Sequence, residues 1–284
     1  MKTSNKFYES KKDTYFCNME KSMLFKNTKI SYTDSGKGPV VVLLHGFLEN
    51  KHMWKEVIPI ISKNKRVLAL DLLGHGQSGC LGYIHSMEIM AEAVSAVLKS
   101  LRIRKITLIG HSMGGYVSLA LSEKNPEMIR GLCLLNSTAT SDDTSRKKLR
   151  ERANKMAQTN LPNIVRMSFI NLFSERSKEI FNPEIQLALS EALQTSLQGY
   201  SASQEGMRIR PNRLSVLKNN HFKKLFILGK KDPVLPVNKG IKEAEETQSE
   251  TVVLSGGHMS HIENSDELTR ILNTFIRQSL SSLG

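Results

Sequence analysis

Short apolar runs rich in Val, Ile and Leu recur along the chain and alternate with longer segments of helical period. Most of the later runs are nearly continuous in apolar residues, which is typical of strands covered on both faces. The predicted strands are residues 23–26, 29–33, 40–44, 66–71, 105–109, 131–135, 223–228 and 251–254. The alternation predicts an α/β fold in which helices flank both faces of a mostly parallel sheet.

Two of the segments of helical period carry a clear apolar stripe. In residues 87–101, and again in residues 265–280, apolar side chains recur at intervals of three and four. This spacing places them on one face of a helix. Ser265, followed by two acidic residues, is an ordinary helix start. We therefore predict a helix over each segment.

The strand pattern stops in the middle of the chain, where polar helical segments are broken by Pro162, Pro183 and Pro211. A stretch of about 70 residues is too long for a structureless connection within a compact domain, so we interpret it as a helical insertion. The predicted division is a polar N-terminal extension (1–22), a core (23–138 and 213–284) and a helical cap (139–212).

Composition places the chain among globular proteins. Of its 284 residues, 39% are hydrophobic by type and a further 18 are glycine, so disorder, collagen and coiled coil are excluded for the chain as a whole. The longest uninterrupted apolar run, residues 40–44, is far shorter than the ~18 residues of a membrane-spanning helix. We expect no membrane span.

The three cysteines, Cys17, Cys80 and Cys133, are too few and of the wrong parity for a disulfide framework. Charged residues interrupt residues 1–22 throughout, so this segment lacks the apolar core of a secretory signal. Both observations favour a reducing compartment, and we predict a cytoplasmic protein.

Lysine and arginine number 40 against 27 acidic residues, which gives a formal net charge of +13. An excess of this size affects solubility and encounters with anions but does not define a fold. The basic run from Arg146 to Arg152 contains no aromatic residue on which a nucleobase could stack. We interpret such runs as solvated helix faces and predict no nucleic-acid partner.

The strongest local motif is Gly-His-Ser-Met-Gly at residues 110–114, which follows an apolar strand and precedes a helical stripe. A strand that turns sharply into a helix needs small residues around the turn, and it exposes the hydroxyl between them. The motif predicts that Ser112 is a nucleophile.

A hydroxyl is a weak nucleophile at neutral pH, so it needs a base and a group that orients the base. Asp232 follows the strand at 223–228, and His258 follows the next strand. His261 is a second candidate for the base, but the Gly-Gly pair directly before His258 favours that residue. Two histidines three residues apart are also typical of metal ligands. No third ligand stands at zinc-like spacing, however, so no metal is predicted.

Attack on a carbonyl also needs fixed donors for the oxyanion that develops. The sequence His45-Gly46-Phe47 ends the strand at 40–44, and the turn allowed by glycine can direct the Phe47 N–H into the site. Met113, at the start of the helix after the nucleophile, can supply the second N–H. We predict these two backbone groups as the oxyanion hole.

Five motifs together resemble the α/β-hydrolase fold superfamily, in its order and at its spacing, over about residues 23–280. They are HGF at 45–47, DLLGHGQS at 71–78, GHSMGG at 110–115, GKKDP at 229–233 and GGHMSHIEN at 256–264. The resemblance implies an eight-stranded, mostly parallel sheet with an antiparallel second strand, a helical cap after strand six and a Ser112-His258-Asp232 triad. It implies no cofactor.

The resemblance also assigns supporting roles and separates related branches. Residues with a loop-holding role are expected to be His45, Asp71, Gly74, His75 and Gly76. Dehalogenases and epoxide hydrolases of this fold carry an aspartate where this chain has Ser112. The alternative position for the acid, after strand six, holds the uncharged Asn136, which leaves Asp232.

The predicted function is hydrolysis of a small-molecule carboxylic ester of small or medium acyl length through an acyl-enzyme. Thioesterase, lactonase, carbon-carbon hydrolase, perhydrolase and acyltransferase reactions use the same triad and stay open, as does a non-catalytic receptor on this fold. Carbon-carbon hydrolases usually carry Asn where His111 stands. Predicted substrate-binding residues are Phe47, His111, Met113, Phe169, Phe173 and Met207, although apolar cap residues at helical spacing also suit plain burial. The basic residues Arg208, Arg210 and Arg213 suggest an ester that carries a carboxylate or phosphate.

Overall fold

The computed structural model describes residues 20–281, and one sheet of eight strands runs through it in the order β1-β2-β4-β3-β5-β6-β7-β8. The strands are β1 (Glu20–Phe25), β2 (Thr28–Ser35), β3 (Val40–Leu44), β4 (Arg66–Leu70), β5 (Ile106–His111), β6 (Ile129–Leu135), β7 (Lys223–Gly229) and β8 (Glu250–Leu254). Strand β2 pairs antiparallel with both of its neighbours, and every pair from β4 to β8 is parallel. The predicted sheet is confirmed.

The predicted strands differ from the observed ones only at their ends. Strand β1 begins at Glu20, three residues before the expected start, because Glu20 pairs with Thr33 across the first hairpin. The rest of the expected extension, residues 1–19, lies outside the described residues.

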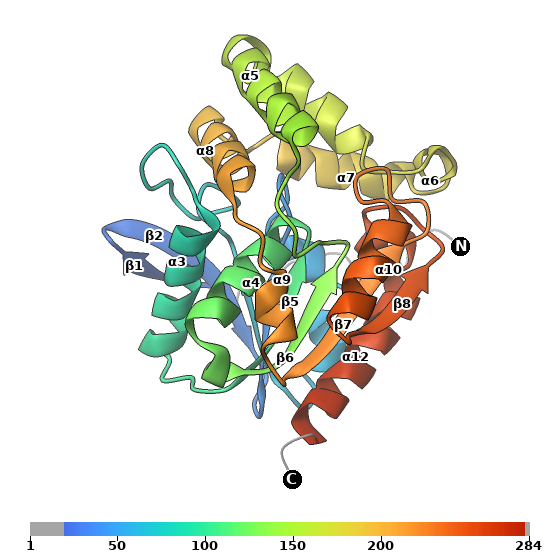
Figure 1. Cartoon of the computed structure of the whole chain (residues 1–284). Coiled ribbons are helices and arrows are strands. Elements are labelled where there is room, and N and C mark those ends of the chain that lie inside the picture. The colour runs from blue at the N-terminus through green and yellow to red at the C-terminus, as the bar shows by residue number, and fades with distance from the viewer. Residues whose placement is uncertain (1–19, 282–284) are drawn as a thin grey trace, which may run out of the picture.

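Helices cover both faces of the sheet (Figure 1). One face packs on α3 (Met87–Ser100), α4 (Met113–Lys124), α9 (Leu214–Lys218) and α10 (Val237–Glu246), and the other on η1 (Lys51–Trp54), α2 (Ile58–Ile61) and α12 (Ser265–Ser281). Along β3, Val42 and Leu44 enter the first core while Val41 and Leu43 enter the second. Alternate side chains of one strand therefore fill two cores, which explains the continuous apolar runs.

A helical cap follows β6 and lies over the edge at which the parallel strands end (Figure 1). Its helices are α5 (Thr144–Ile170), α6 (Glu175–Ile180), α7 (Asn182–Ala192) and α8 (Leu197–Ile209). The break predicted at Pro162 lies within the range of α5, where two helical segments meet at a kink and Asn160 leaves helical geometry (φ −154°, ψ 72°). Pro183 stands in the first turn of α7, where a missing N–H costs nothing. The remaining elements are η2 (Pro126–Met128) and α11 (Ser260–Glu263).

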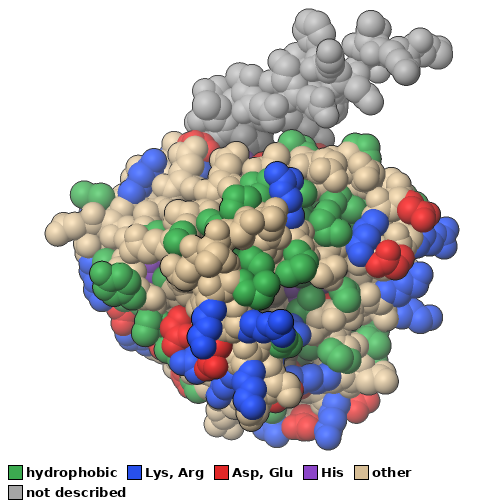
Figure 2. Space-filling model, turned by 90° about the horizontal axis from the view of Figure 1, so that it is seen from above, with side chains coloured by type: hydrophobic (Ala, Val, Ile, Leu, Met, Phe, Trp, Pro, Cys, Tyr) green, Lys and Arg blue, Asp and Glu red, His purple; other side chains and the backbone are tan. Residues whose placement is uncertain are grey.

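Seen from the cap side, Lys and Arg side chains are scattered among acidic, apolar and other residues (Figure 2). The basic run in α5 is not uniformly solvated, however. Lys148 and Arg152 are exposed, whereas Arg146 and Arg150 are partly buried and line a cavity beneath the cap. The interpretation of the run as a plain solvated face is therefore wrong for two of its members, because positions four residues apart share one helix face.

Candidate active site

Ser112 occupies the sharp turn between β5 and α4, with φ 47° and ψ −112°. A positive φ is strained for a residue with a side chain, and here the Ser112 N–H is fixed by the Leu135 carbonyl at 2.9 Å. The turn is tight because α4 starts against β3: a Cβ on Gly114 would lie 2.5 Å from the Leu44 carbonyl oxygen. This packing explains the glycine two residues after the serine.

Two side chains from the ends of other strands meet Ser112. The Ser112 hydroxyl donates to His258 Nε2 at 2.9 Å, and His258 Nδ1–H donates to Asp232 Oδ2 at 2.7 Å. Asp232 follows β7 and His258 follows β8, so the parallel strands deliver all three groups to one edge of the sheet. The described structure thus contains a continuous hydroxyl-imidazole-carboxylate array.

The Asp232 carboxylate is buried but well supported. Its Oδ1 accepts the backbone N–H groups of Val234 and Leu235 at 2.8 and 2.9 Å, and its Oδ2 also accepts from the Asn136 amide at 3.2 Å. Burial raises the pKa of Asp232, but the charge and hydrogen bond of His258 and the backbone donors outweigh burial and hold that pKa below its ordinary value. The carboxylate is therefore ionised at neutral pH and fixes the proton on Nδ1 of His258.

His261, the second candidate for the base, points toward Glu49 and not toward Ser112. Its Nε2 lies 3.6 Å from Glu49 Oε1, and its ring meets the His111 ring edge-on with centroids 5.8 Å apart. Burial, with the nearby positive groups, lowers the pKa of His261 to about 4, so its imidazole is neutral at pH 7. The geometry therefore assigns the contact with Ser112 to His258.

A second acid-imidazole pair, absent from the sequence predictions, lies directly behind the array. Glu49 Oε2 accepts from His111 Nδ1 at 2.6 Å, and His111 Nε2 donates to the His258 carbonyl at 2.9 Å. The same Glu49 oxygen accepts the Gly46 N–H at 2.6 Å, and a Cβ on Gly46 would collide with both side chains. His111, predicted to bind substrate, thus also holds the loop that carries His258.

The pKa values of this pair move in opposite directions. Burial disfavours the ionised carboxylate, yet the charge and hydrogen bond of His111 lower the pKa of Glu49 to about 2. Burial also disfavours the imidazolium, yet the charge and hydrogen bond of Glu49 raise the pKa of His111. No local motif links the two residues, since they stand 62 positions apart.

The two residues predicted to supply oxyanion donors, Phe47 and Met113, lie on segments that follow β3 and β5. Met113 is the first residue of α4, so its N–H belongs to the turn in which helical N–H groups lack intrahelical partners. Phe47 follows the Gly46 turn and lines the same cavity as Ser112. Their roles remain a proposal, which the position of both residues supports.

A cavity of about 400 Å³ opens onto Ser112 and His258 beneath the cap. Of the predicted substrate-binding residues, Phe47, His111 and Met207 line it. The other three do not: Met113 is buried in the sheet core, Phe173 in the cap core, and Phe169 faces a different cavity. The cap prediction could not separate lining from packing, because both place apolar residues at helical spacing.

Two arginines of α5 also line the cavity at Ser112, which will be called the catalytic cavity, and the sequence did not predict this position for them. Arg150 is paired, donating to Asp142 at 2.5 Å and to Gln204 at 2.8 Å. Arg146 has no acidic partner among the described residues; its guanidinium donates to the Val234 carbonyl at 3.3 Å. Because Val234 N–H binds Asp232, this contact places the Arg146 side chain beside the array.

The arginines predicted to attract an anionic substrate are already engaged. Arg208 pairs with Glu205 and Glu151, Arg210 pairs with Asp142 and stacks on Tyr116, and Arg213 pairs with Glu88 and Glu123. None of the three lines the catalytic cavity. The ion pairs of Arg208 and Arg210 lie within the cap, and those of Arg213 join that residue to α3 and α4 of the core.

The loop that follows β4 is held from beneath by buried polar groups. Asp71 accepts from the Lys51 ammonium at 2.8 Å and from the Gln77 N–H at 3.0 Å. His45 Nε2 accepts the Leu72 N–H at 2.9 Å, and His75 Nδ1 bonds the Leu73 carbonyl at 3.1 Å. These contacts suit the supporting role predicted for this group of residues.

Neither a metal centre nor a membrane-crossing helix is found in the described part of the chain. Within residues 20–281, no three His, Cys, Asp or Glu side chains are grouped as metal ligands. Nor does any helix there combine the length and the apolar character that crossing a bilayer requires.

Comparison with known proteins places the fold in a family. The sequence model of the alpha/beta hydrolase fold matches residues 39–265, so the chain belongs to this family. The chain is similar to an esterase from Thermogutta terrifontis, solved with malate bound, at a TM-score of 0.86 and 26% identity over 92% of this chain and 98% of that one.

Two curated relatives differ in reaction. The chain is 28% identical over 246 residues to the dihydrolipoyllysine-residue acetyltransferase component of the acetoin cleaving system of Pseudomonas putida, covering 85% of this chain and 64% of the relative. It is also 28% identical over 138 residues to (E)-2-((N-methylformamido)methylene)succinate hydrolase of Acinetobacter baylyi, covering 49% and 52%. The chain thus spans less than two thirds of either relative.

Proposed function

We propose that this protein hydrolyses carboxylic esters through an acyl-enzyme formed on Ser112. The observation that carries the proposal is the unbroken chain of hydrogen bonds from the Ser112 hydroxyl through His258 to Asp232, at 2.9 and 2.7 Å. A serine hydroxyl so arranged can lose its proton to the imidazole while it forms a bond to a carbonyl carbon.

Two half-reactions follow from this geometry. Ser112 Oγ bonds the ester carbon, His258 takes the serine proton, and the N–H groups of Phe47 and Met113 hold the oxyanion. When the carbon-alkoxide bond breaks, His258 returns the proton to the departing oxygen. Water then repeats the sequence on the acyl-enzyme and releases the acid, so no cofactor takes part.

The substrate we propose is an ester that carries a negative charge away from the scissile bond. Arg146 presents a guanidinium to the cavity, and no acidic side chain in the described residues neutralises it. Arg150 also lines the cavity and is paired with Asp142, and no acidic side chain is among the residues that line it, so the wall carries a positive charge at Arg146. A carboxylate can accept two parallel hydrogen bonds from a guanidinium, which fixes its orientation.

The comparisons support an anionic substrate. The Thermogutta terrifontis esterase has malate bound, which is a dicarboxylate, and the Acinetobacter baylyi relative is named as a hydrolase of a substituted succinate. Both compounds carry more than one carboxyl group.

A panel of 4-nitrophenyl esters from acetyl to palmitoyl, with one thioester and one lactone, tests the reaction class. Ser112→Ala should lower turnover by a factor of about 10⁵ to 10⁶. His258→Ala should have a comparable effect, whereas His261→Ala should retain most of the activity. Undiminished hydrolysis by the Ser112 variant would exclude the proposal.

A matched pair of esters tests the charge preference: mono-4-nitrophenyl adipate and 4-nitrophenyl hexanoate have the same chain length and differ in one terminal carboxylate. We expect a higher kcat/KM for the adipate, and Arg146→Ala should lower it about 10- to 100-fold for that ester alone. Arg152→Ala, on the exposed side of the same helix, is the control. Equal losses for both esters would contradict recognition by charge.

A further inference from the structure

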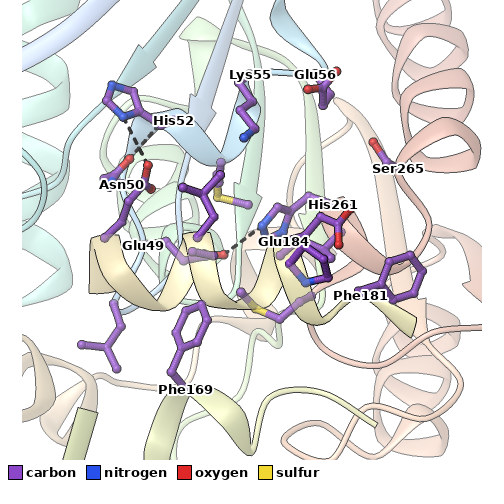
Figure 3. Close-up of a pocket in the computed structure, with 18 residues that line it drawn as sticks. Glu49, Asn50, His52, Lys55, Glu56, Phe169, Phe181, Glu184, His261 and Ser265 are labelled. Atoms are coloured by element: carbon purple, nitrogen blue, oxygen red, sulfur yellow. Dashed lines mark hydrogen bonds and ion pairs between the residues drawn. The ribbon is translucent and has the colours of Figure 1, made fainter. Parts of the chain in front are cut away.

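A second cavity, of about 420 Å³, is lined in part by the loop that follows β3 (Figure 3). Its walls are that loop, helix α7 of the cap, and the segment from Met259 to Ser265. Leu48 and Met259 line both this cavity and the catalytic one, so their side chains form the partition between the two. The volume is within the range of small-molecule sites, roughly 300 to 1,000 Å³.

Two buried polar side chains in its wall are incompletely satisfied. Glu49 and His261 point toward one another in the cavity wall (Figure 3), and their side chains are only 4% and 7% exposed. Glu49 Oε1 and His261 Nδ1 have no hydrogen-bond partner among the described residues. Buried polar atoms without a partner are uncommon in native proteins and each one needs an explanation.

The protonation of these groups determines what could satisfy them. Glu49 is ionised, so Oε1 only accepts hydrogen bonds. His261 is neutral, and its proton belongs on Nε2, which faces Glu49 Oε1 at 3.6 Å, because the other tautomer would set two acceptors against each other. Nδ1 is then an acceptor too. Both unsatisfied atoms therefore need N–H or O–H donors.

The charge around the cavity selects among donors. Its lining includes the carboxylates of Glu49, Glu56, Glu184 and Glu191 against Lys55, His52 and the neutral His261, and Glu49 is also paired with His111 behind the wall. The remaining wall is largely apolar. It includes Phe169, Phe181 and Leu187. The occupant that suits this combination has an apolar body and a positively charged donor group.

We propose that this second cavity binds a small organic cation, a protonated primary amine on an aliphatic or aromatic body, with its ammonium directed at Glu49 and His261. The ammonium donates to Glu49 Oε1, which lacks a hydrogen-bond partner, and its charge meets the carboxylates of the wall. The apolar body replaces water against the aromatic and aliphatic side chains. This site is separate from ester hydrolysis and does not depend on it.

Calorimetric titration of the full-length protein tests the site with three probes of one shape: benzylamine, benzyl alcohol and benzoate. Benzylamine should bind saturably and at least about 10-fold more tightly than benzyl alcohol, the gain typical of a charge-assisted hydrogen bond. Benzoate should not bind this cavity. Because the measurement needs no turnover, it stands whether or not the protein is an esterase.

Variants locate the binding. Ala188→Trp, on the cavity side of α7, should abolish benzylamine binding by filling the space, while Gln186→Trp, on the exposed side of the same helix, should leave it unchanged. Glu184→Lys, at the exposed rim, should weaken binding about two- to five-fold without any change in packing. Its control is Glu179→Lys, an exposed glutamate of α6 outside the cavity.

Three results would overturn the proposal: no saturable benzylamine binding, equal affinities for the amine and the alcohol, or binding that survives Ala188→Trp. The last would place the amine in the catalytic cavity instead. Glu49→Gln should also weaken benzylamine at least about 10-fold, but the charge and cavity variants decide the question even if that variant folds poorly.

Discussion

Two acid-imidazole pairs lie side by side in this molecule with almost the same geometry. Asp232 and His258 are joined at 2.7 Å, and Glu49 and His111 at 2.6 Å. They differ in what the second ring nitrogen meets: for His258 it is the Ser112 hydroxyl, and for His111 it is the backbone carbonyl of His258. An acid beside an imidazole therefore does not by itself define a catalytic pair.

The second partner determines the protonation state. A hydroxyl can donate, so Nε2 of His258 can be unprotonated and act as a base. A carbonyl only accepts, so His111 needs protons on both nitrogens to satisfy the carbonyl and Glu49 together, and its pKa is raised accordingly. The His258 pair is thus suited to move a proton, whereas the His111 pair is suited to hold one.

Breaking the first pair should affect the reaction most. Asp232→Asn retains the shape of the side chain but removes the charge that orients His258 and stabilises its imidazolium, so we expect kcat to fall by about 10⁴, the magnitude seen when the acid of a serine-protease triad is replaced. Ester hydrolysis and denaturant unfolding should be measured together. A loss of activity that only follows a loss of folded protein would contradict this role.

Breaking the second pair should affect stability more than chemistry. Glu49→Gln removes the charge that keeps the buried His111 ring protonated, so the ring gives up a proton and one of its hydrogen bonds. Removal of one partner from a buried pair typically costs about 3 to 5 kcal/mol in the free energy of unfolding. Urea unfolding measures this cost. The exposed Glu184→Gln should change it by less than about 0.5 kcal/mol. Equal effects from the two variants would show that the Glu49 pair does not stabilise the fold.

The two pairs also differ in whether the sequence alone predicts them: the pair of Asp232 and His258 was predicted, and the pair of Glu49 and His111 was not. The His258 array was predictable because each member ends a strand and stands in a local pattern, such as the glycines around Ser112. The sheet was predictable for a similar reason, since strands such as β3 are apolar on both faces. In each case the physical requirement acts on neighbours in the chain.

The remaining site residues depend on tertiary contacts that leave no local pattern. Glu49 resembles any loop acid until the fold brings His111 against it. Arg146 and Arg150 belong to a basic run whose inward face is visible only once α5 is placed over the cavity. Phe173 and Met207 look alike in sequence, yet one fills the cap core and the other lines the catalytic cavity.

The pH dependence of stability should separate the Glu49 pair from other acids. The pKa of Glu49 falls from 4.5 to about 2 on folding. Its stabilisation is therefore fully present above pH 4.5 and is lost as the pH falls toward 2, by about 3 kcal/mol in all. The difference in unfolding free energy between wild type and Glu49→Gln should narrow over this range. A difference that stays constant with pH would contradict the pairing.

At alkaline pH the change runs in the opposite direction: stabilisation by His111 is lost as the pH rises, whereas stabilisation by Glu49 is lost as the pH falls. The pKa of His111 is raised above 6.5, so its part of the stabilisation is present below that pH and is lost as the pH rises through the folded pKa. The advantage of wild type over Glu49→Gln should therefore shrink again as the pH rises through the pKa of His111 in the folded protein.

The smallest effect is spectroscopic, and it tests the difference between the pairs most directly. In ¹⁵N-resolved NMR spectra at neutral pH, His111 should show protons on both ring nitrogens, because the carboxylate and the carbonyl that flank it both accept. His258 should show a proton on Nδ1 alone, since Nε2 accepts the Ser112 hydroxyl. In Glu49→Gln the His111 ring should lose its second proton while His258 is unchanged. If His111 carried only one ring proton in the wild-type protein, one of its two hydrogen bonds would have no proton. The ring could then not donate both to Glu49 and to the carbonyl of His258, and the proposed role of the pair would be wrong.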